Sequence, residues 1–221
     1  MIIWPILAIL FAGLEVLALR KDLARLEYIA KPAVMICLFL WLFTSTGLQG
    51  NLLWFGMGIL LSLAGDLLLM APLDRFFIAG LVAFLFTHIC YLIGFQEQLL
   101  NLTGWSVILL FFILLNGIRL IRRIVTAMRA SGQDALVYPV IVYGLVISLV
   151  LYTAMSTIFD PAWKTGAAFF ASIGAFLFYL SDLILAWNKF VSPIQNSRIL
   201  NMLAYHLGQI GLIAGVIHQF S

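Results

Sequence analysis

Charged residues are scarce in this sequence of 221 residues. Asp, Glu, Lys and Arg together make up 10% of it, whereas hydrophobic residues make up 64%. A soluble domain carries about 25% charged residues, which keep its surface in water. The shortage of charge excludes a soluble globular domain. The apolar excess predicts an all-α protein that crosses the membrane several times.

Cysteine is also scarce, and both Cys37 and Cys90 fall in apolar runs. A lone pair of buried thiols excludes a disulfide framework or a zinc site and predicts packing roles. The N-terminus lacks a basic region and a small-residue cleavage site, so residues 2–19 are expected to stay as a membrane span. No basic and aromatic cluster indicates nucleic acid, and nothing points to a cofactor or a protein partner.

What the sequence does contain is a series of apolar segments, each about 20 residues long and so sufficient to cross a bilayer. Eight are expected, at residues 2–19, 31–47, 52–71, 75–95, 102–121, 136–158, 164–187 and 198–219. Little chain is left between them. The sequence therefore predicts a single transmembrane domain over residues 1–221.

The basic residues predict the orientation of these spans. All of the 12 lysines and arginines except Lys164 fall on one side if the spans alternate in direction. Cytoplasmic loops carry the excess of Lys and Arg, so both termini are expected on the non-cytoplasmic side. The expected location is a bacterial inner (cytoplasmic) membrane, where the basic loops also contact lipid head groups.

Two carboxylates interrupt the apolar runs. Asp66 lies in Gly65-Asp66-Leu67-Leu68-Leu69, and Asp182 lies in Ser181-Asp182-Leu183-Ile184-Leu185. A charge in a hydrocarbon span costs about 2.5 kcal/mol or more, so such residues indicate a functional site. At about 1.5 Å per residue, both are expected roughly 8 to 10 Å inside the cytoplasmic boundary. At equal depth the two carboxylates can face each other.

The similarity between the two Asp segments extends along the chain. Asp66 is followed by His88 and Asp182 by His206, while Lys31-Pro32 opens one early span and Tyr138-Pro139 a later one. These matches predict a parallel repeat of four plus four helices, over residues 1–96 and 102–221, with the site where the halves meet.

Other polar residues in the spans are candidates for the same site. The set expected to contact substrate is Glu15, Lys31, His88, Asn116, Arg119, Tyr138, Tyr205 and Gln209. Each has a structural alternative, as an interhelical hydrogen bond, a core histidine or a charge partner. For the two Asp residues that alternative is an ion pair with Lys31 or Arg119. His88 and His206 with the carboxylates form too small a set for a metal site, because His218 lies near the other face.

Two buried carboxylates close together cannot both ionise, so the pair supplies one acid and one base. Such a pair can protonate an acetal-like bond and stabilise the resulting oxocarbenium ion. It can equally gain and lose a proton in a proton-coupled carrier of lipids or small molecules. The residues alone leave both functions open, whereas a purely structural scaffold leaves the matched acids unexplained.

Several motifs resemble the lysoplasmalogenase family of eight-span membrane proteins, the YhhN and TMEM86 type. They are Lys31-Pro32, Gly65-Asp66-Leu67-Leu68-Leu69, the run 77–84 leading to His88 and Tyr91, the run 174–182, and Tyr205-His206-Leu207-Gly208-Gln209. They follow the family order over most of the chain. His206 departs from the family pattern, in which a second aromatic residue would follow Tyr205.

The resemblance implies a hydrolase acting on ether bonds, with a lysophospholipid as its partner in the bilayer. The expected reaction cleaves the vinyl ether of a lysoplasmalogen to a fatty aldehyde and glycerophosphocholine or glycerophosphoethanolamine. One of Asp66 and Asp182 would donate the proton, and the other would stabilise the cation and activate water. Lys31, Arg119 or Tyr138 would hold the head-group phosphate, and the 18 phenylalanines would supply an apolar slot.

Overall fold

The fold was described from a computed structural model, which covers residues 2–71, 74–100 and 102–221. Within these residues, eight helices are long and apolar enough to cross a membrane. The same residues form no β-strand. The prediction of an all-α, multi-pass membrane protein is therefore confirmed.

The helices follow one another with short connections. The order is α1 (Ile3–Arg20), α2 (Ala24–Thr46), α3 (Leu52–Met70), α4 (Asp74–Gly94), the short α5 (Gln96–Leu100), α6 (Gly104–Ala130), η1 (Asp134–Leu136), α7 (Val137–Ser156), η2 (Thr157–Phe159), α8 (Thr165–Phe190) and α9 (Ser197–Phe220).

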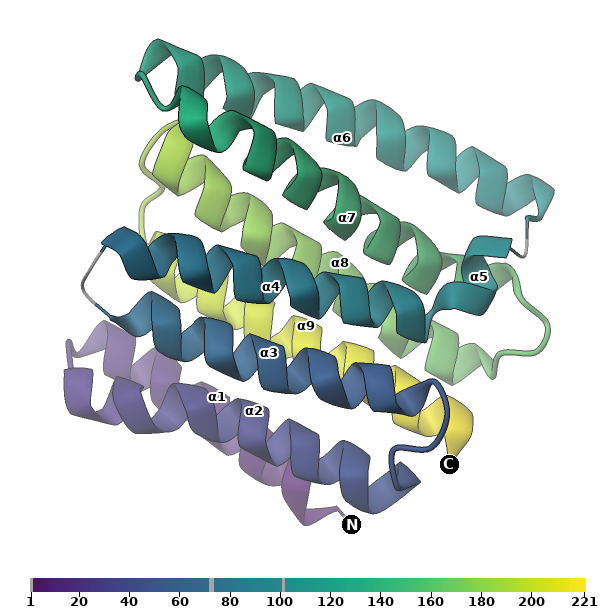
Figure 1. The fold of residues 1–221 in the computed structure, drawn as a ribbon. Coiled ribbons are helices and arrows are strands. Elements are labelled where there is room, and N and C mark those ends of the chain that lie inside the picture. Colours follow the sequence, from purple (N-terminus) through teal and green to yellow (C-terminus); the bar gives the residue numbers. More distant parts are fainter. Residues whose placement is uncertain (1, 72–73, 101) are drawn as a thin grey trace.

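The long helices run alongside one another in one bundle, and both chain ends lie at the same end of it (Figure 1). Helices α1 and α2 form one edge and α6 the opposite edge (Figure 1). In each half, successive helices pack as neighbours, from α1 to α4 and from α6 to α9, and the halves meet through α4 with α7 and α9 with α1 and α2. The parallel repeat and the non-cytoplasmic termini remain predictions.

Helix α2 begins earlier than the expected span at residue 31. It starts at Ala24 and continues through Pro32. Lys31 therefore lies inside the helix rather than at its opening, and it is buried. The helix ends at Gly47, whose φ of 65° is the left-handed conformation that glycine adopts without steric cost. The early start places the Lys31 ammonium within reach of the neighbouring helices.

Helix α6 is longer than the expected span at residues 102–121. It begins with a capping box, in which the Thr103 hydroxyl accepts from the Ser106 backbone N–H and the Ser106 hydroxyl accepts from Thr103 N–H. Its far end continues to Ala130 and carries arginines, of which Arg123 lies 4.7 Å from the centre of the Trp187 ring. The basic end of α6 thus packs beside the end of α8.

Helices α8 and α9 make the most extensive contact in the bundle. A Cβ built on Gly174 would lie 2.1 Å from the Leu212 backbone nitrogen, and one on Gly208 would lie 2.6 Å from that of Phe178. These glycines, one on each helix, let the two backbones approach closely. The close contact holds Asp182 of α8 and Tyr205 of α9 in a common core.

Candidate functional site

Asp66 lies on α3 with a fully enclosed carboxylate. Its side chain is 1% exposed, and Lys31 Nζ of α2 lies 3.3 Å from Oδ1, at an ion-pair distance but outside hydrogen-bond geometry. The Tyr205 hydroxyl of α9 donates to Oδ2 at 2.8 Å. A buried charge is tolerated where it is paired and hydrogen-bonded, and both conditions are met here. The ion pair with Lys31 is the structural alternative that the sequence left open.

A second polar network fills the interior next to Asp66, about one turn nearer the N-terminus of α3. The Tyr91 hydroxyl donates to Gln209 Oε1 at 2.7 Å, and Gln209 Nε2 donates to the Ser62 hydroxyl at 2.8 Å. Ser62 in turn donates to Thr87 at 3.3 Å. Gln209, a predicted substrate contact, is therefore fully engaged in linking α3, α4 and α9.

Asp182 lies on α8 in a different setting. Its Oδ2 accepts from the Tyr143 hydroxyl of α7 at 2.6 Å and lies 2.9 Å from His88 Nε2 of α4. An ionised carboxylate only accepts hydrogen bonds, so the imidazole N–H donates to it in that state. The Asp182 side chain is 13% exposed, more than that of Asp66. The partners of Asp182 are thus a tyrosine and a histidine, both of which can be uncharged, whereas Asp66 is paired with a lysine.

The two carboxylates have separate partners, and in the described part of the chain neither a hydrogen bond nor an ion pair joins them. The ring of Phe178 lies between their partners, 4.7 Å from His88 and 5.5 Å from Tyr205 between ring centres. The equal depth inferred from the sequence allowed the two acids to face each other. The structure instead arranges two centres on either side of one aromatic ring.

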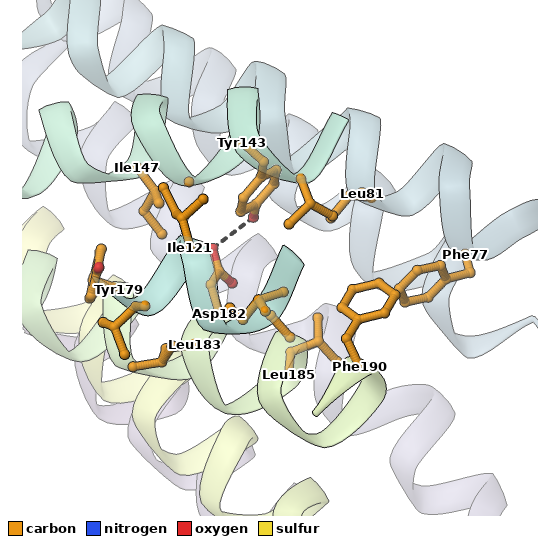
Figure 2. A pocket seen from close by; sticks show the side chains of 15 residues that line it. Phe77, Leu81, Ile121, Tyr143, Ile147, Tyr179, Asp182, Leu183, Leu185 and Phe190 are labelled. Atoms are coloured by element: carbon orange, nitrogen blue, oxygen red, sulfur yellow. Dashed lines mark hydrogen bonds between the residues drawn. The ribbon is translucent and has the colours of Figure 1, made fainter. Parts of the chain in front are cut away.

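Asp182 forms part of the wall of a pocket between α4, α6, α7 and α8 (Figure 2). This apolar pocket is a narrow groove with a cavity volume of about 70 Å³, and it is partly open to the outside. Its lining is Phe77, Leu81, Leu120, Ile121, Ile124, Val140, Tyr143, Gly144, Ile147, Tyr179, Asp182, Leu183, Leu185, Ala186 and Phe190. Asp182 is the one carboxylate among the described residues of this lining.

A second pocket lies at the end of the bundle where α2 and α9 begin. This charged pocket is lined by Leu19, Ala24, Glu27, Tyr28, Lys31, Leu69, Met70, Phe77, Ile184, Leu185, Asn188, Ser197, Arg198, Asn201 and Met202. Phe77 and Leu185 line both pockets, so the apolar and charged pockets adjoin. The apolar lining of one and the charged lining of the other suit a ligand with one apolar chain and one polar head.

The remaining predicted residues lie away from both pockets. Glu15 and His206 are buried and contact each other through Oε2 and Nε2, which joins α1 to α9. Asn116 is exposed and donates to the Phe112 carbonyl of its own helix at 2.8 Å. Arg119 and Tyr138 are exposed and line neither pocket. Of the eight expected substrate contacts, only Lys31 is in the described lining of either pocket. His88 and Tyr205 contact the two carboxylates, and the other five have other surroundings.

Some residues of the site were not expected from the sequence. Tyr143 was not among the expected site residues, and its hydroxyl donates an interhelical hydrogen bond to Asp182. Glu27 and Arg198 share a pocket although they are far apart in the chain. A tyrosine inside an apolar span was a usable signal for the first, whereas nothing local indicates the second. Among the described residues, no three His, Cys, Asp or Glu side chains lie close enough together to hold a metal ion.

Residues 26–216 match the model of the YhhN family. The match covers most of the chain. This protein belongs to the YhhN family. Membership of this family was predicted from the order of motifs around Lys31, Asp66, His88, Asp182 and Tyr205, and the prediction is confirmed.

Curated relatives of this YhhN protein carry lysoplasmalogenase names. It is 28% identical to lysoplasmalogenase TMEM86B of Homo sapiens over 184 residues, which are 81% of this chain and 69% of that protein. It is 32% identical to lysoplasmalogenase TMEM86A of Homo sapiens over 158 residues, which are 69% of this chain and 60% of that protein. No solved structure matches the chain. The names of these relatives indicate that the family includes membrane hydrolases.

Proposed function

We propose that this protein hydrolyses the vinyl ether bond of lysoplasmalogens, releasing a fatty aldehyde and glycerophosphocholine or glycerophosphoethanolamine. The observation that carries the proposal is the pair of adjoining pockets, one apolar with Asp182 in its wall and one lined by Lys31, Glu27 and Arg198. A lysolipid has one chain and one charged head group, so each part has a matching space. The names of the relatives support the same reaction.

In this proposal the two carboxylates have different roles. Asp182 lines the apolar pocket, where the chain and its vinyl ether would lie. Because Tyr143 and His88 both contact Oδ2, the mechanism assigns the transferable proton to Oδ1. Asp66 is enclosed beside Lys31 and lines neither described pocket, so it has no contact with the space proposed for the vinyl ether. Asp182 is therefore the proton donor, and Asp66 is a positioning residue that holds Lys31 in the wall of the charged pocket.

The reaction begins when Asp182 gives its proton to the vinyl carbon that is β to the ether oxygen. The C=C π electrons form the new C–H bond, and the adjacent carbon becomes an oxocarbenium ion, which the Asp182 carboxylate stabilises. Water then adds to that carbon and returns a proton to Asp182. The resulting hemiacetal loses the glycerol oxygen as an alcohol and leaves the aldehyde. Tyr143 and His88 hold the carboxyl group in place through both steps.

The test uses the purified protein in detergent micelles with a lysoplasmalogen and, separately, its saturated alkyl-ether analogue. The expected result is release of free aldehyde from the vinyl ether alone, because only an alkene can accept the proton on carbon. Absence of aldehyde from a preparation that still binds the alkyl-ether lipid would overturn the proposal. Intact lipid in the control without protein establishes that aldehyde does not arise from spontaneous acid hydrolysis.

The expected inner-membrane location and non-cytoplasmic termini belong to the same proposal. The charged pocket lies at the basic end of the bundle, where Arg20, Lys21 and Arg25 join α1 to α2. If that end faces the cytoplasm, the head group enters from the cytoplasmic leaflet. Labelling of single cysteines placed at residue 22 and near the C-terminus would distinguish the two orientations.

A further inference from the structure

The charged pocket holds an ion pair that the proposed reaction does not use. Arg198 Nη2 lies 2.8 Å from Glu27 Oε1 and 3.0 Å from Oε2. The Arg198 side chain is 68% exposed and that of Glu27 is 19% exposed, so the pair lies at the mouth of the pocket. A solvent-exposed ion pair contributes little to stability, so the two charges can exchange each other for a ligand at small cost.

The pocket offers charges of both signs to a head group. Lys31 and Arg198 are its cations, and Glu27 is the one carboxylate in its described lining. A guanidinium carries five N–H donors, and the pair with Glu27 uses one of its nitrogens. Arg198 can therefore hold a phosphate while Glu27 accepts from a cation on the same head group. The charge pattern fits a zwitterionic head group.

Three other polar side chains of the pocket make hydrogen bonds within the protein. Asn201 Nδ2 donates to the Ser181 carbonyl at 2.7 Å, and Asn188 Oδ1 accepts from the Ile194 backbone N–H at 2.9 Å. The Tyr28 hydroxyl donates to the Met70 carbonyl at 3.0 Å. These groups shape the pocket, and recognition of a cation falls to the Glu27 carboxylate.

We propose that Glu27 selects the head group and favours a primary ammonium, as in ethanolamine, over a trimethylammonium, as in choline. A carboxylate accepts strong N–H hydrogen bonds from a primary ammonium, which a trimethylammonium lacks. Trimethylammonium groups are instead recognised by aromatic faces. Of the two aromatic residues in the pocket, Phe77 already has Lys189 Nζ 4.8 Å from its ring centre. The inference rests on the proposed function and specifies its substrate.

The experiment compares lysoplasmenylethanolamine with lysoplasmenylcholine of the same chain on the purified protein and on Glu27→Gln. We expect a higher kcat/KM for the ethanolamine lipid. Glu27→Gln should lower that value about tenfold and the choline value less than about twofold, because one charge-assisted hydrogen bond is lost. Glu97→Gln is the matched control, since Glu97 is exposed on α5 at the opposite end of the bundle and should leave the ratio unchanged (Figure 1).

Equal kcat/KM values for the two lipids, or an equal loss for both in Glu27→Gln, would overturn the inference while aldehyde release upholds the proposed function. A binding experiment tests head-group selection independently of hydrolysis. It measures, by tryptophan fluorescence, the binding of non-cleavable alkyl-ether analogues that carry each of the two head groups. A Glu27-dependent preference in binding without any aldehyde would uphold the head-group selection and overturn the hydrolysis. Binding without preference and without aldehyde would overturn both.

Discussion

The Asp66 and Asp182 centres differ in what surrounds two nearly identical sequence segments. Asp66 is 1% exposed, has a lysine at 3.3 Å and lines neither pocket. Asp182 is 13% exposed, has a tyrosine and a histidine as partners, and lines the apolar pocket (Figure 2). One carboxylate is thus paired with a cation inside the protein, and the other borders a pocket. The difference comes from the neighbouring helices, not from the local sequence.

The partners also follow a common arrangement. Asp66 of α3 is held by α2 of its own half and by α9 of the other, through Lys31 and Tyr205. Asp182 of α8 is held by α7 of its own half and by α4 of the other, through Tyr143 and His88. Each centre therefore connects the two halves of the bundle. The same framework serves stability at one centre and access at the other.

The largest expected effect on catalysis is that of Asp182→Asn. The amide cannot donate a proton to carbon, so turnover of a lysoplasmalogen should fall about 10²- to 10⁴-fold, the usual contribution of a general acid. The melting temperature should change little, because Tyr143 can still donate to the amide oxygen. Asp134→Asn, at an exposed position in η1, is the matched control. Near-normal aldehyde release from Asp182→Asn would reverse the roles assigned to the two centres.

Asp66→Asn should act on stability first. It leaves the Lys31 ammonium buried without its anion, which costs about 3 to 5 kcal/mol for a buried pair. Thermal unfolding in detergent measures the loss. The double variant Lys31→Met/Asp66→Asn removes both charges and should regain most of the stability. If the double variant is no more stable than Asp66→Asn, the ion pair is not what holds this centre together.

The two tyrosines allow a matched comparison of a single hydroxyl. Tyr143→Phe removes the donor to Asp182 and should lower turnover about tenfold with a small stability change. Tyr205→Phe removes the donor to the enclosed Asp66 and should cost about 1 to 3 kcal/mol of stability, because a buried acceptor loses its partner. Both variants are compared by turnover per folded molecule and by melting temperature. Tyr143→Phe should change turnover more than melting temperature, and Tyr205→Phe should change melting temperature more than turnover. The same change in both variants would mean that the centres are equivalent.

Much of the fold was predictable because hydropathy acts locally. Each span is apolar enough to identify from its own residues, and only the ends of α2 and α6 differed substantially from expectation, since Pro32 did not stop one helix and arginines continued the other. The site was less predictable. His88, Tyr143 and Asp182 come from three helices, and Glu27 and Arg198 from two more. Their contacts depend on how helices pack, which spacing along the chain does not encode.

The smallest expected effect comes from a residue outside both centres. Arg119 was expected to touch a carboxylate or the substrate phosphate, but it is exposed on α6 and lines neither pocket. Arg119→Gln should therefore leave KM and turnover within about twofold of the parent, as exposed substitutions usually do. Arg198→Gln, which removes a cation from the charged pocket, should raise KM for both head groups, since both carry the phosphate. A larger rise in KM for Arg119→Gln than for Arg198→Gln would place the phosphate beside α6 instead.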